Sequence, residues 1–280
     1  MTRISNFDEL VAQLSARQSV CRMAVVCGSD ASTRSAVERA AEAGFVCPTF
    51  IDDNDVDAAA AAAVAMVRAG EADVIMKGLI NTDNLLRAVL NKETGILPKG
   101  QVLTHITALE MPGMDRLLFC TDVAVLPQPT PEQRRCQIDY LLGLCRSMGI
   151  DEPRIGLVNC SEKVSEKHFP HTVDYRAIAA EAAEGRFGRC IIDGPLDLKT
   201  CFSAEALKKK GLTSPLEGRA DAVVFPDIQA GNVFYKTVTL FCHARTAAVL
   251  AGPSVPVVLT SRGDNPDSKF YSIALACLNK

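Results

Sequence analysis

The sequence predicts an α/β protein built on a parallel sheet. Short apolar runs alternate with helix-like stretches along almost the whole chain, and 48% of the residues are hydrophobic, which suffices for a substantial core. The length of 280 residues fits one large domain or two of ordinary size. Because binding loops follow the carboxyl ends of parallel strands, the residues after each strand are the first candidates for function.

The first part of the chain predicts three strands and three helices in alternation. The strands are residues 22–27, 45–51 and 72–76, and the helices are residues 32–43, residues 56–69 and a helix that opens at residues 81–83. The second helix has four aspartates between residues 52 and 57 at its positive end, and Gly70 ends it. The third helix carries apolar residues on one face, at Leu85, Leu86, Val89 and Leu90.

The later chain continues the alternation. We expect strands at residues 116–121, 154–158, 189–192, 222–225 and 255–259, helices at residues 131–148, 175–184, 203–209 and 232–250, and a last helix that starts near Asp267. The proline-rich segment 125–131 is the best candidate for a crossing between two domains, because its prolines cannot continue either neighbouring element.

Charge and composition exclude several classes of protein. The net charge is -3, and no basic run alternates with aromatic residues, so we expect no nucleic-acid partner. The longest apolar stretch, residues 58–67, is mostly alanine and far shorter than the roughly 20 residues that cross a bilayer. The first residues lack the apolar region of a secretory signal. These observations predict a cytoplasmic protein that does not enter a membrane.

Cysteine and histidine give no sign of a disulfide framework or a metal site. The 11 cysteines are spread along the chain without a Cys-x-x-Cys motif, which is typical of reduced core thiols. His168 and His171 form a His-x-x-His pair, but Pro170 lies between them and no acidic ligand pattern accompanies them. We expect no bound metal.

Two polar motifs follow strands in the first and middle parts of the chain. Lys77 and Gly78 come directly after the strand at 72–76 and precede a helix start, an arrangement that suits phosphate; the alternative is a solvated lysine before a helix capped by Thr82 or Asp83. Asp193 and Gly194 predict a sharp turn, with the glycine allowing a ligand close to the backbone.

Two further motifs follow strands near the end of the chain. Gly231 and Asn232 begin a predicted helix. Asn232 either binds a ligand there or is simply the N-cap of the helix. After the strand at 255–259, Ser261 and Arg262 place a hydroxyl and a guanidinium beside a glycine, which suits an anion such as phosphate; the alternative is an arginine tied to a structural carboxylate.

Common catalytic fingerprints are missing from the sequence. No Gly-x-Gly-x-x-Gly follows a strand, and residues 95–101 copy the spacing of a P-loop without its Lys-Ser/Thr. There is no Gly-x-Ser-x-Gly elbow and no convincing cysteine and histidine pair. A nucleoside-triphosphate enzyme and an acyl-enzyme are therefore disfavoured.

Four segments, in this order, resemble the phosphate acetyltransferase and phosphate butyryltransferase family. They are Lys-Gly-Leu-Ile-Asn-Thr at 77–82, Asp-Gly-Pro-Leu at 193–196, Pro-Asp-Ile-Gln-Ala-Gly-Asn-Val-Phe-Tyr-Lys at 226–236 and Leu-Thr-Ser-Arg at 259–262. The resemblance covers the chain from about Val74 to its end. Residues 77–90 and the short N-terminal region resemble the butyryltransferase branch more than the acetyltransferase branch.

The resemblance implies a two-domain, parallel-sheet fold like that of isocitrate dehydrogenase, with an interdomain cleft and assembly as a homodimer or larger homo-oligomer. Since the last helices of the family return to the first domain, we place that domain at 1–125 plus 260–280 and the second at 126–259. The implied reaction exchanges phosphate and coenzyme A on a short-chain acyl group. It uses coenzyme A and phosphate as substrates, with no cofactor, no metal and no covalent intermediate.

The resemblance also implies roles for single residues. Arg262 would hold phosphate and steady the charge of the tetrahedral centre, Ser261 would donate to the same oxygen, and Asp267 would take the thiol proton of coenzyme A, with Asp264 as the alternative base. The residues expected to line the substrate side are Lys77, Thr82, Arg87, Gly231, Asn232 and Asp264. The sequence departs from the family pattern at residues 159–164 and at Lys199, where an acidic residue is usual.

Three alternatives stay open at the level of sequence. The first is phosphate acetyltransferase activity. The second is a metal- and NAD-dependent dehydrogenase of the same fold, which the absence of an aspartate cluster disfavours. The third is a binding protein that keeps the coenzyme A cleft without turnover.

Overall fold

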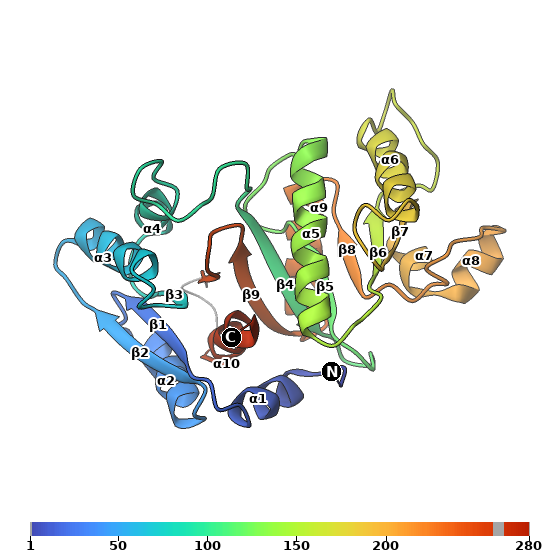
Figure 1. Ribbon diagram of the computed structural model, residues 1–280. Helices are drawn as coiled ribbons and strands as arrows, with labels where there is room; N and C mark the ends of the chain where they lie inside the picture. Colours follow the sequence, from blue (N-terminus) through green and yellow to red (C-terminus); the bar gives the residue numbers. More distant parts are fainter. Residues whose placement is uncertain (1, 260–265, 280) are drawn as a thin grey trace. The chain divides into compact units, whose positions relative to one another are not determined.

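The structure is a computed structural model that describes residues 2–259 and 266–279. It divides into two compact units (Figure 1). Unit 1 contains Met1–Arg3 and Thr104–Ala244, and unit 2 contains Ile4–Leu103 and Arg245–Lys280. Among the described residues, no helix combines the length and the apolar character needed to cross a membrane.

Unit 2 is a sheet of five strands with helices packed on it. Its elements are α1 (Phe7–Ser15), β1 (Cys21–Val26), α2 (Ala31–Glu42), β2 (Val46–Ile51), α3 (Val56–Arg68), β3 (Val74–Lys77), α4 (Thr82–Val89), β9 (Arg245–Ala251), β10 (Val257–Val258), α10 (Pro266–Ala276) and the 3-10 turn η1 (Cys277–Asn279). The strand order is β2-β1-β3-β10-β9, and only β9 runs antiparallel to its neighbour β10. Helix α2 packs against α10, and α3 packs against α4.

Unit 1 contains five further strands. Its elements are β4 (Thr104–Glu110), β5 (Leu118–Thr121), α5 (Pro131–Ser147), β6 (Arg154–Val158), α6 (His171–Ala183), β7 (Ile191–Leu196), α7 (Leu198–Phe202), α8 (Ala204–Lys210), β8 (Ala222–Val224) and α9 (Ile228–Leu240). The order is β4-β5-β8-β6-β7, with β4 antiparallel to β5 and the other pairs parallel. The α/β class predicted from the sequence is confirmed.

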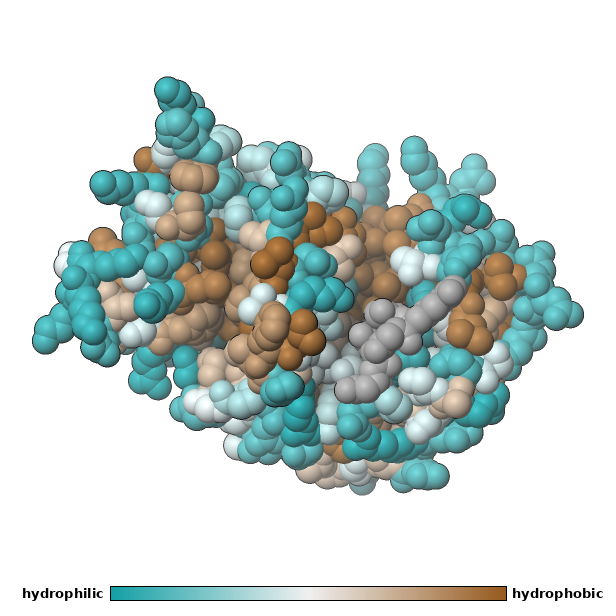
Figure 2. Space-filling view, turned by 180° about the vertical axis from the view of Figure 1, so that it is seen from behind, coloured by the Kyte–Doolittle hydropathy of each residue, from teal (hydrophilic) through white to brown (hydrophobic). Residues whose placement is uncertain are grey.

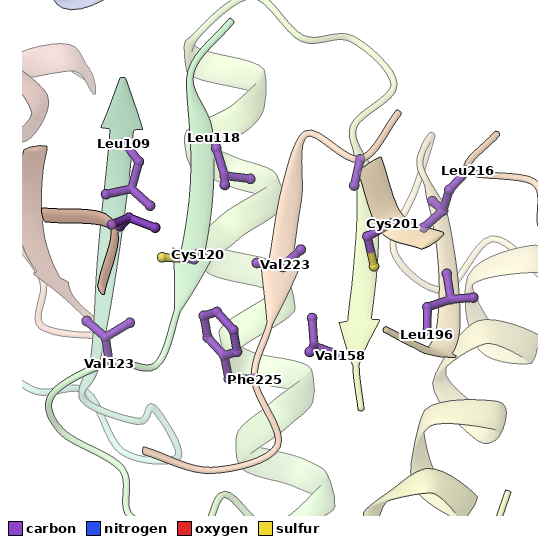
Figure 3. Packing of buried hydrophobic residues seen from close by; sticks show 12 residues of the cluster. Leu109, Leu118, Cys120, Val123, Val158, Leu196, Cys201, Leu216, Val223 and Phe225 are labelled. Carbon is purple, nitrogen blue, oxygen red and sulfur yellow. The ribbon is translucent and has the colours of Figure 1, made fainter. Parts of the chain in front are cut away.

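The core of unit 1 lies between its strands and helix α9. Cys120 on β5, Val223 on β8 and Leu196 on β7 are buried and belong to one cluster (Figure 3). Phe225, just after β8, is part of the same cluster, and its ring lies 5.2 Å from that of Phe234 on α9. Burial of this apolar surface holds the strand ends of unit 1 in fixed positions.

Local signals in the sequence explain where the helices begin. Asp55 caps α3 by accepting hydrogen bonds from the backbone N–H groups of Asp57 and Ala58. Thr130 and Gln133 form a reciprocal capping box at the start of α5. The predicted helices at 56–69 and 131–148 match α3 and α5 closely because each has its own cap.

The helix predicted at 232–250 is wrong. Helix α9 starts earlier, at Ile228, because the Asp227 side chain accepts a hydrogen bond from the N–H of Ala230 and caps it. It ends at Leu240, and the chain turns through His243, which has a left-handed φ of 53°, before entering β9. Strand β4 and helix α1 were not predicted at all.

The predicted domain boundaries differ from those of the two units. Strand β4 pairs with β5, and β5 pairs with β8, so the segment 104–125 groups with unit 1. Strand β9 pairs with β10, and α10 packs on β9, so the segment 245–259 groups with unit 2. The proline-rich segment 125–131, expected to be a domain crossing, lies inside unit 1 between β5 and α5.

Candidate functional site

In unit 2, the sheet brings the carboxyl ends of two strands, β3 and β10, to the same side. Strands β3 and β10 are parallel, and Val258 pairs with Met76. The chain therefore leaves β10 at the edge where Lys77 ends β3. The motif residues Ser261, Arg262 and Asp264 come next along the chain and lie outside the described residues.

Lys77 is a buried lysine at the end of β3. The residue is only 4% exposed, and its Nζ donates a hydrogen bond to the carbonyl oxygen of Gly78 at 3.3 Å. Gly78 permits a close approach of β1, since a Cβ there would lie 2.1 Å from the carbonyl oxygen of Cys27. Lys77 is therefore not the solvated surface lysine of the alternative interpretation.

The N-terminus of α4 lies just beyond Lys77. Asn81 is the N-cap residue, and its side chain makes no capping hydrogen bond. Thr82 and Asp83 are the first helical residues, so neither caps the helix as the alternative interpretation required. A helix start without a side-chain cap leaves its first N–H groups available to an anion.

Arg87 faces another direction. Its Nη1 lies 3.6 Å from Oδ2 of Asp57 on α3, and Asn84 donates to Oδ1 of the same carboxylate at 2.7 Å. These residues line a cavity of about 580 Å³ between α3 and α4. Arg87 is five positions after Thr82, which is about 140° around a helix. The structure therefore does not group Arg87 with Lys77 and Thr82.

Asp267 lies in the first turn of α10 and is paired. Its Oδ1 accepts a hydrogen bond from Nη1 of Arg39 at 2.5 Å, and both side chains are exposed. As a proton acceptor it would first have to exchange this partner. Arg39 could not be identified from the sequence, because its pairing depends on α2 and α10 lying side by side.

A buried lysine in the first turn of α10 was also not predicted as part of a site. Lys269 donates to Oγ1 of Thr33 at 3.1 Å and lies 3.5 Å from Oδ1 of Asp30, the N-cap of α2. Burial acts to raise the pKa of the Asp30 carboxyl, but hydrogen bonds from Thr33 and the charge of Lys269 outweigh it and lower that pKa. Asp30 thus stays ionised and ties α10 to the loop after β1.

In unit 1, Gly231 and Asn232 dock α9 onto the loop after β5. A Cβ on Gly231 would lie 2.1 Å from the carbonyl oxygen of Asp122, so only glycine fits. Asn232 donates from Nδ2 to the carbonyl oxygen of Val123 at 3.0 Å. The prediction that these two residues begin the helix is wrong, since Asp227 is the cap and they lie inside α9.

Asp122 is a buried carboxylate that the sequence analysis missed. It accepts hydrogen bonds from the Thr104 hydroxyl at 2.7 Å and from the backbone N–H groups of residues 105, 124, 125 and 126. This set of donors orders the loop on which α9 rests. Its signal was an aspartate directly after the strand at 116–121.

Asp193 and Gly194 lie within strand β7 and form no turn. A Cβ on Gly194 would lie 2.5 Å from Cβ of Leu157, so the glycine lets β6 approach rather than a ligand. The Asp193 carboxylate accepts a hydrogen bond from the Ser214 hydroxyl at 2.6 Å. The turn prediction is wrong because the strand continues through both residues to Leu196.

A cavity of about 530 Å³ lies beyond the carboxyl ends of β6, β7 and β8. Its apolar walls include Val158, Leu198 and Phe225, and polar groups come from Asp227 and from His171. Nε2 of His171 lies 3.2 Å from Oδ1 of Asn159. Burial, followed by the charge of Arg134, lowers the pKa of His171. The neutral ring and apolar walls suit an uncharged group.

The sequence matches the family described as "Phosphate acetyl/butaryl transferase" over residues 33–277. It is 34% identical to phosphate butyryltransferase of Clostridium acetobutylicum, with 98% of each chain covered. It is 38% identical to phosphate acetyltransferase of Thermotoga maritima, with 77% of this chain and 73% of that protein covered.

One solved structure is similar in both fold and sequence. A branched-chain phosphotransacylase from Enterococcus faecalis V583 aligns with a TM-score of 0.83 and 29% identity. The alignment covers 92% of this chain and 98% of that protein.

Proposed function

Because this chain belongs to the phosphate acetyl/butyryl transferase family, and is thus a phosphate acyltransferase, we propose that its acyl group is butanoyl (butanoyl-CoA + phosphate = butanoyl phosphate + CoA). Two phosphate butyryltransferases of Clostridium species that match 98% of this chain support the choice of acyl group. Phosphate acetyltransferase is the alternative, which the Thermotoga relative favours. The family match leaves the dehydrogenase interpretation without support.

The observation that carries the proposal is the parallel register of β3 and β10. Val257 and Val258 pair with Ile75 and Met76, so the next residues of both strands emerge at one edge. There the buried Lys77 and the uncapped start of α4 present positive charge and N–H groups. Positive charge and backbone N–H groups are what a phosphate group binds to.

In the proposed reaction a phosphate oxygen attacks the thioester carbonyl carbon. The C–O bond forms, the carbonyl oxygen takes the negative charge, and the C–S bond then breaks to release the coenzyme A thiolate. Arg262 and Ser261 would stabilise the developing oxyanion, a role that is worth about 3 kcal/mol for one well-placed donor. Lys77, Thr82, Arg87, Gly231 and Asn232 stay predictions as substrate-binding residues.

In the reverse direction a carboxylate takes the proton of the coenzyme A thiol. The ordinary pKa of a thiol is about 8.5, so a base helps but has little barrier to remove. We propose Asp267 for this role, after it releases Arg39, and Asp264 as the alternative. Transfer would then be direct and would need no metal, cofactor or covalent intermediate.

The first experiment is the phosphate-dependent loss of thioester absorbance with acetyl-, propionyl-, butyryl- and longer acyl-coenzyme A, in the presence of a chelator. The highest kcat/KM with butyryl-coenzyme A would support the proposal. A preference for acetyl-coenzyme A would favour the acetyltransferase. Binding of coenzyme A without turnover would favour the binding protein, and turnover that needs metal and NAD would favour the dehydrogenase.

We also propose a homodimer or larger homo-oligomer in the cytoplasm. The oligomer is supported by exposed apolar residues along α9 and at its C-cap, where Val233, Leu240 and Phe241 are 66%, 65% and 73% exposed. Figure 2, which views the molecule from the side on which α9 lies, shows hydrophobic residues gathered on that face. Light scattering with a Phe241→Asp variant tests this, since a shift to monomer is expected.

A further inference from the structure

Four arginines line one cavity of about 240 Å³ in unit 1. They are Arg3, Arg116, Arg154 and Arg219. Arg154 is the first residue of β6, Arg116 precedes β5, and Arg219 precedes β8. The cavity therefore lies at the amino ends of these parallel strands, at the edge of the sheet opposite Asp122 and Asp227.

One buried carboxylate, Asp221, explains part of this cluster. Its Oδ1 accepts a hydrogen bond from Nη2 of Arg3 at 2.7 Å, and its Oδ2 accepts one from the backbone N–H of Arg154 at 2.9 Å. Nε of Arg116 lies 4.0 Å from Oδ1. Asp221 is thus satisfied by Arg3 and the backbone, and it does not need four guanidinium groups.

The remaining charges do not balance within the cavity. Glu152 is the other acidic residue in the lining, and it pairs with Arg189, which is not part of the lining, at 3.2 Å. Outside the lining, Arg154 pairs with Glu217 and Arg116 pairs with Asp115, each at 2.9 Å, and the charge of Arg219 acts on the same Asp115. The side chains of Asp115 and Glu217 are 84% and 67% exposed, so these pairs are weak and can be exchanged for an anion. The lining itself therefore brings four guanidinium groups to two carboxylates, and the other acidic partners are exposed.

We propose that this cavity is a second anion site, which takes a small phosphate-bearing molecule. The planar guanidinium fork matches two phosphate oxygens at once, and several arginines together can surround one phosphate group. A volume of about 240 Å³ has room for one or two phosphate groups and little more. Because the site lies at the amino ends of the strands, its ligand would not compete with an anion bound at their carboxyl ends.

The site is tested by titrating inorganic phosphate and pyrophosphate into the full chain in a calorimeter at low ionic strength. The Arg262→Ala background removes binding at the predicted reaction site. A phosphate-binding event should persist in that background, and adding Arg219→Ala should weaken it about tenfold, as loss of a charge-assisted hydrogen bond would. Comparing the affinities for phosphate and pyrophosphate distinguishes a site for one phosphate group from a site for two.

Arg186→Ala is the matched control. It removes one half-exposed arginine whose partner is Asp139, and neither residue lines the cavity. Unchanged affinity in this variant, together with an intermediate affinity in Arg219→Lys, supports a site that recognises phosphate through the guanidinium fork. The proposal is overturned if the Arg262→Ala protein binds neither anion at about 10 mM, or if Arg186→Ala weakens binding as much as Arg219→Ala.

Discussion

At the scale of single residues, Gly231 determines whether α9 can rest on the loop after β5. An alanine there would place its Cβ 2.1 Å from the carbonyl oxygen of Asp122. We expect Gly231→Ala to lower the free energy of unfolding by about 1–3 kcal/mol, as overpacking of a close contact does. Urea unfolding followed by circular dichroism measures the loss.

Gly143→Ala is the control for that measurement. Gly143 lies in α5 on an exposed position, and no atom lies within 4 Å of the Cβ that alanine would add. Alanine there should raise the free energy of unfolding by about 0.5–1 kcal/mol, because it restricts the unfolded chain and favours helix. If both variants shift stability in the same direction, the close contact at Gly231 is not what holds α9.

Arg262 is the residue on which the proposed chemistry depends most. Replacing it with alanine should lower kcat for the acyl transfer ~100-fold, because the donor to the developing oxyanion is lost. The loss of thioester absorbance with butyryl-coenzyme A measures the change. The unfolding curve of the variant should match that of the parent protein. Activity within about twofold of normal would remove Arg262 from the mechanism.

At the scale of elements, the cap of α2 couples this helix to α10. Asp30 caps α2 and faces Lys269, and its pKa is lowered in the folded protein. Because the folded pKa lies below the unfolded one, the stability from its charge is complete above about pH 4 and is lost as the pH falls through the folded pKa.

Two substitutions separate the cap from the charge. Asp30→Ala should cost about 1 kcal/mol at pH 7, because the hydrogen bond to the N–H of Thr33 is lost. Asp30→Asn keeps a capping oxygen but should remove the part of the stability that disappears in acid. Urea unfolding of the three proteins at pH 7 and pH 3 checks this, and an identical acid dependence of parent and Asp30→Asn would contradict it.

The sequence predicted elements well where each carried its own boundary signal. Asp55 and Gly70 enclose α3, and the predicted helix at 56–69 is confirmed. The helix prediction for 232–250 was wrong because these residues suit a helix throughout. The helix is ended by the left-handed turn at His243 and by the pairing of β9 with β10. Strand pairing over long separations leaves no local mark in the sequence.

At the scale of the whole molecule, unit 1 is nearly a continuous piece of chain. The segment 104–244 contains all its strands and the cluster around Cys120, Val223 and Phe225. A fragment of residues 104–244 should therefore fold alone and unfold cooperatively in urea. Val223→Asp, which buries a charge in the core, should abolish that transition. A non-cooperative fragment would show that unit 1 needs the rest of the chain.

The candidate site was predictable only in part. Lys77 could be placed at a strand end because an apolar run, residues 72–76, precedes it. The structure puts it beside the end of β10. The pairing of Arg87 with Asp57 and of Asp267 with Arg39 could not be predicted, since each joins two helices that are distant in sequence. The family resemblance named residues by their place in a motif, but motif membership does not say which partner a side chain has.

The position of β10 has a consequence for how the protein is made. This strand lies between β3 and β9 in unit 2, yet it is synthesised after the whole segment 104–244 of unit 1. Unit 1 can fold while synthesis continues, whereas the nascent unit 2 must wait with the edge of β3 unpaired. Slow translation of residues 245–258 would prolong that exposure, and the segment 4–103 would then be the part of the growing chain most in need of a chaperone.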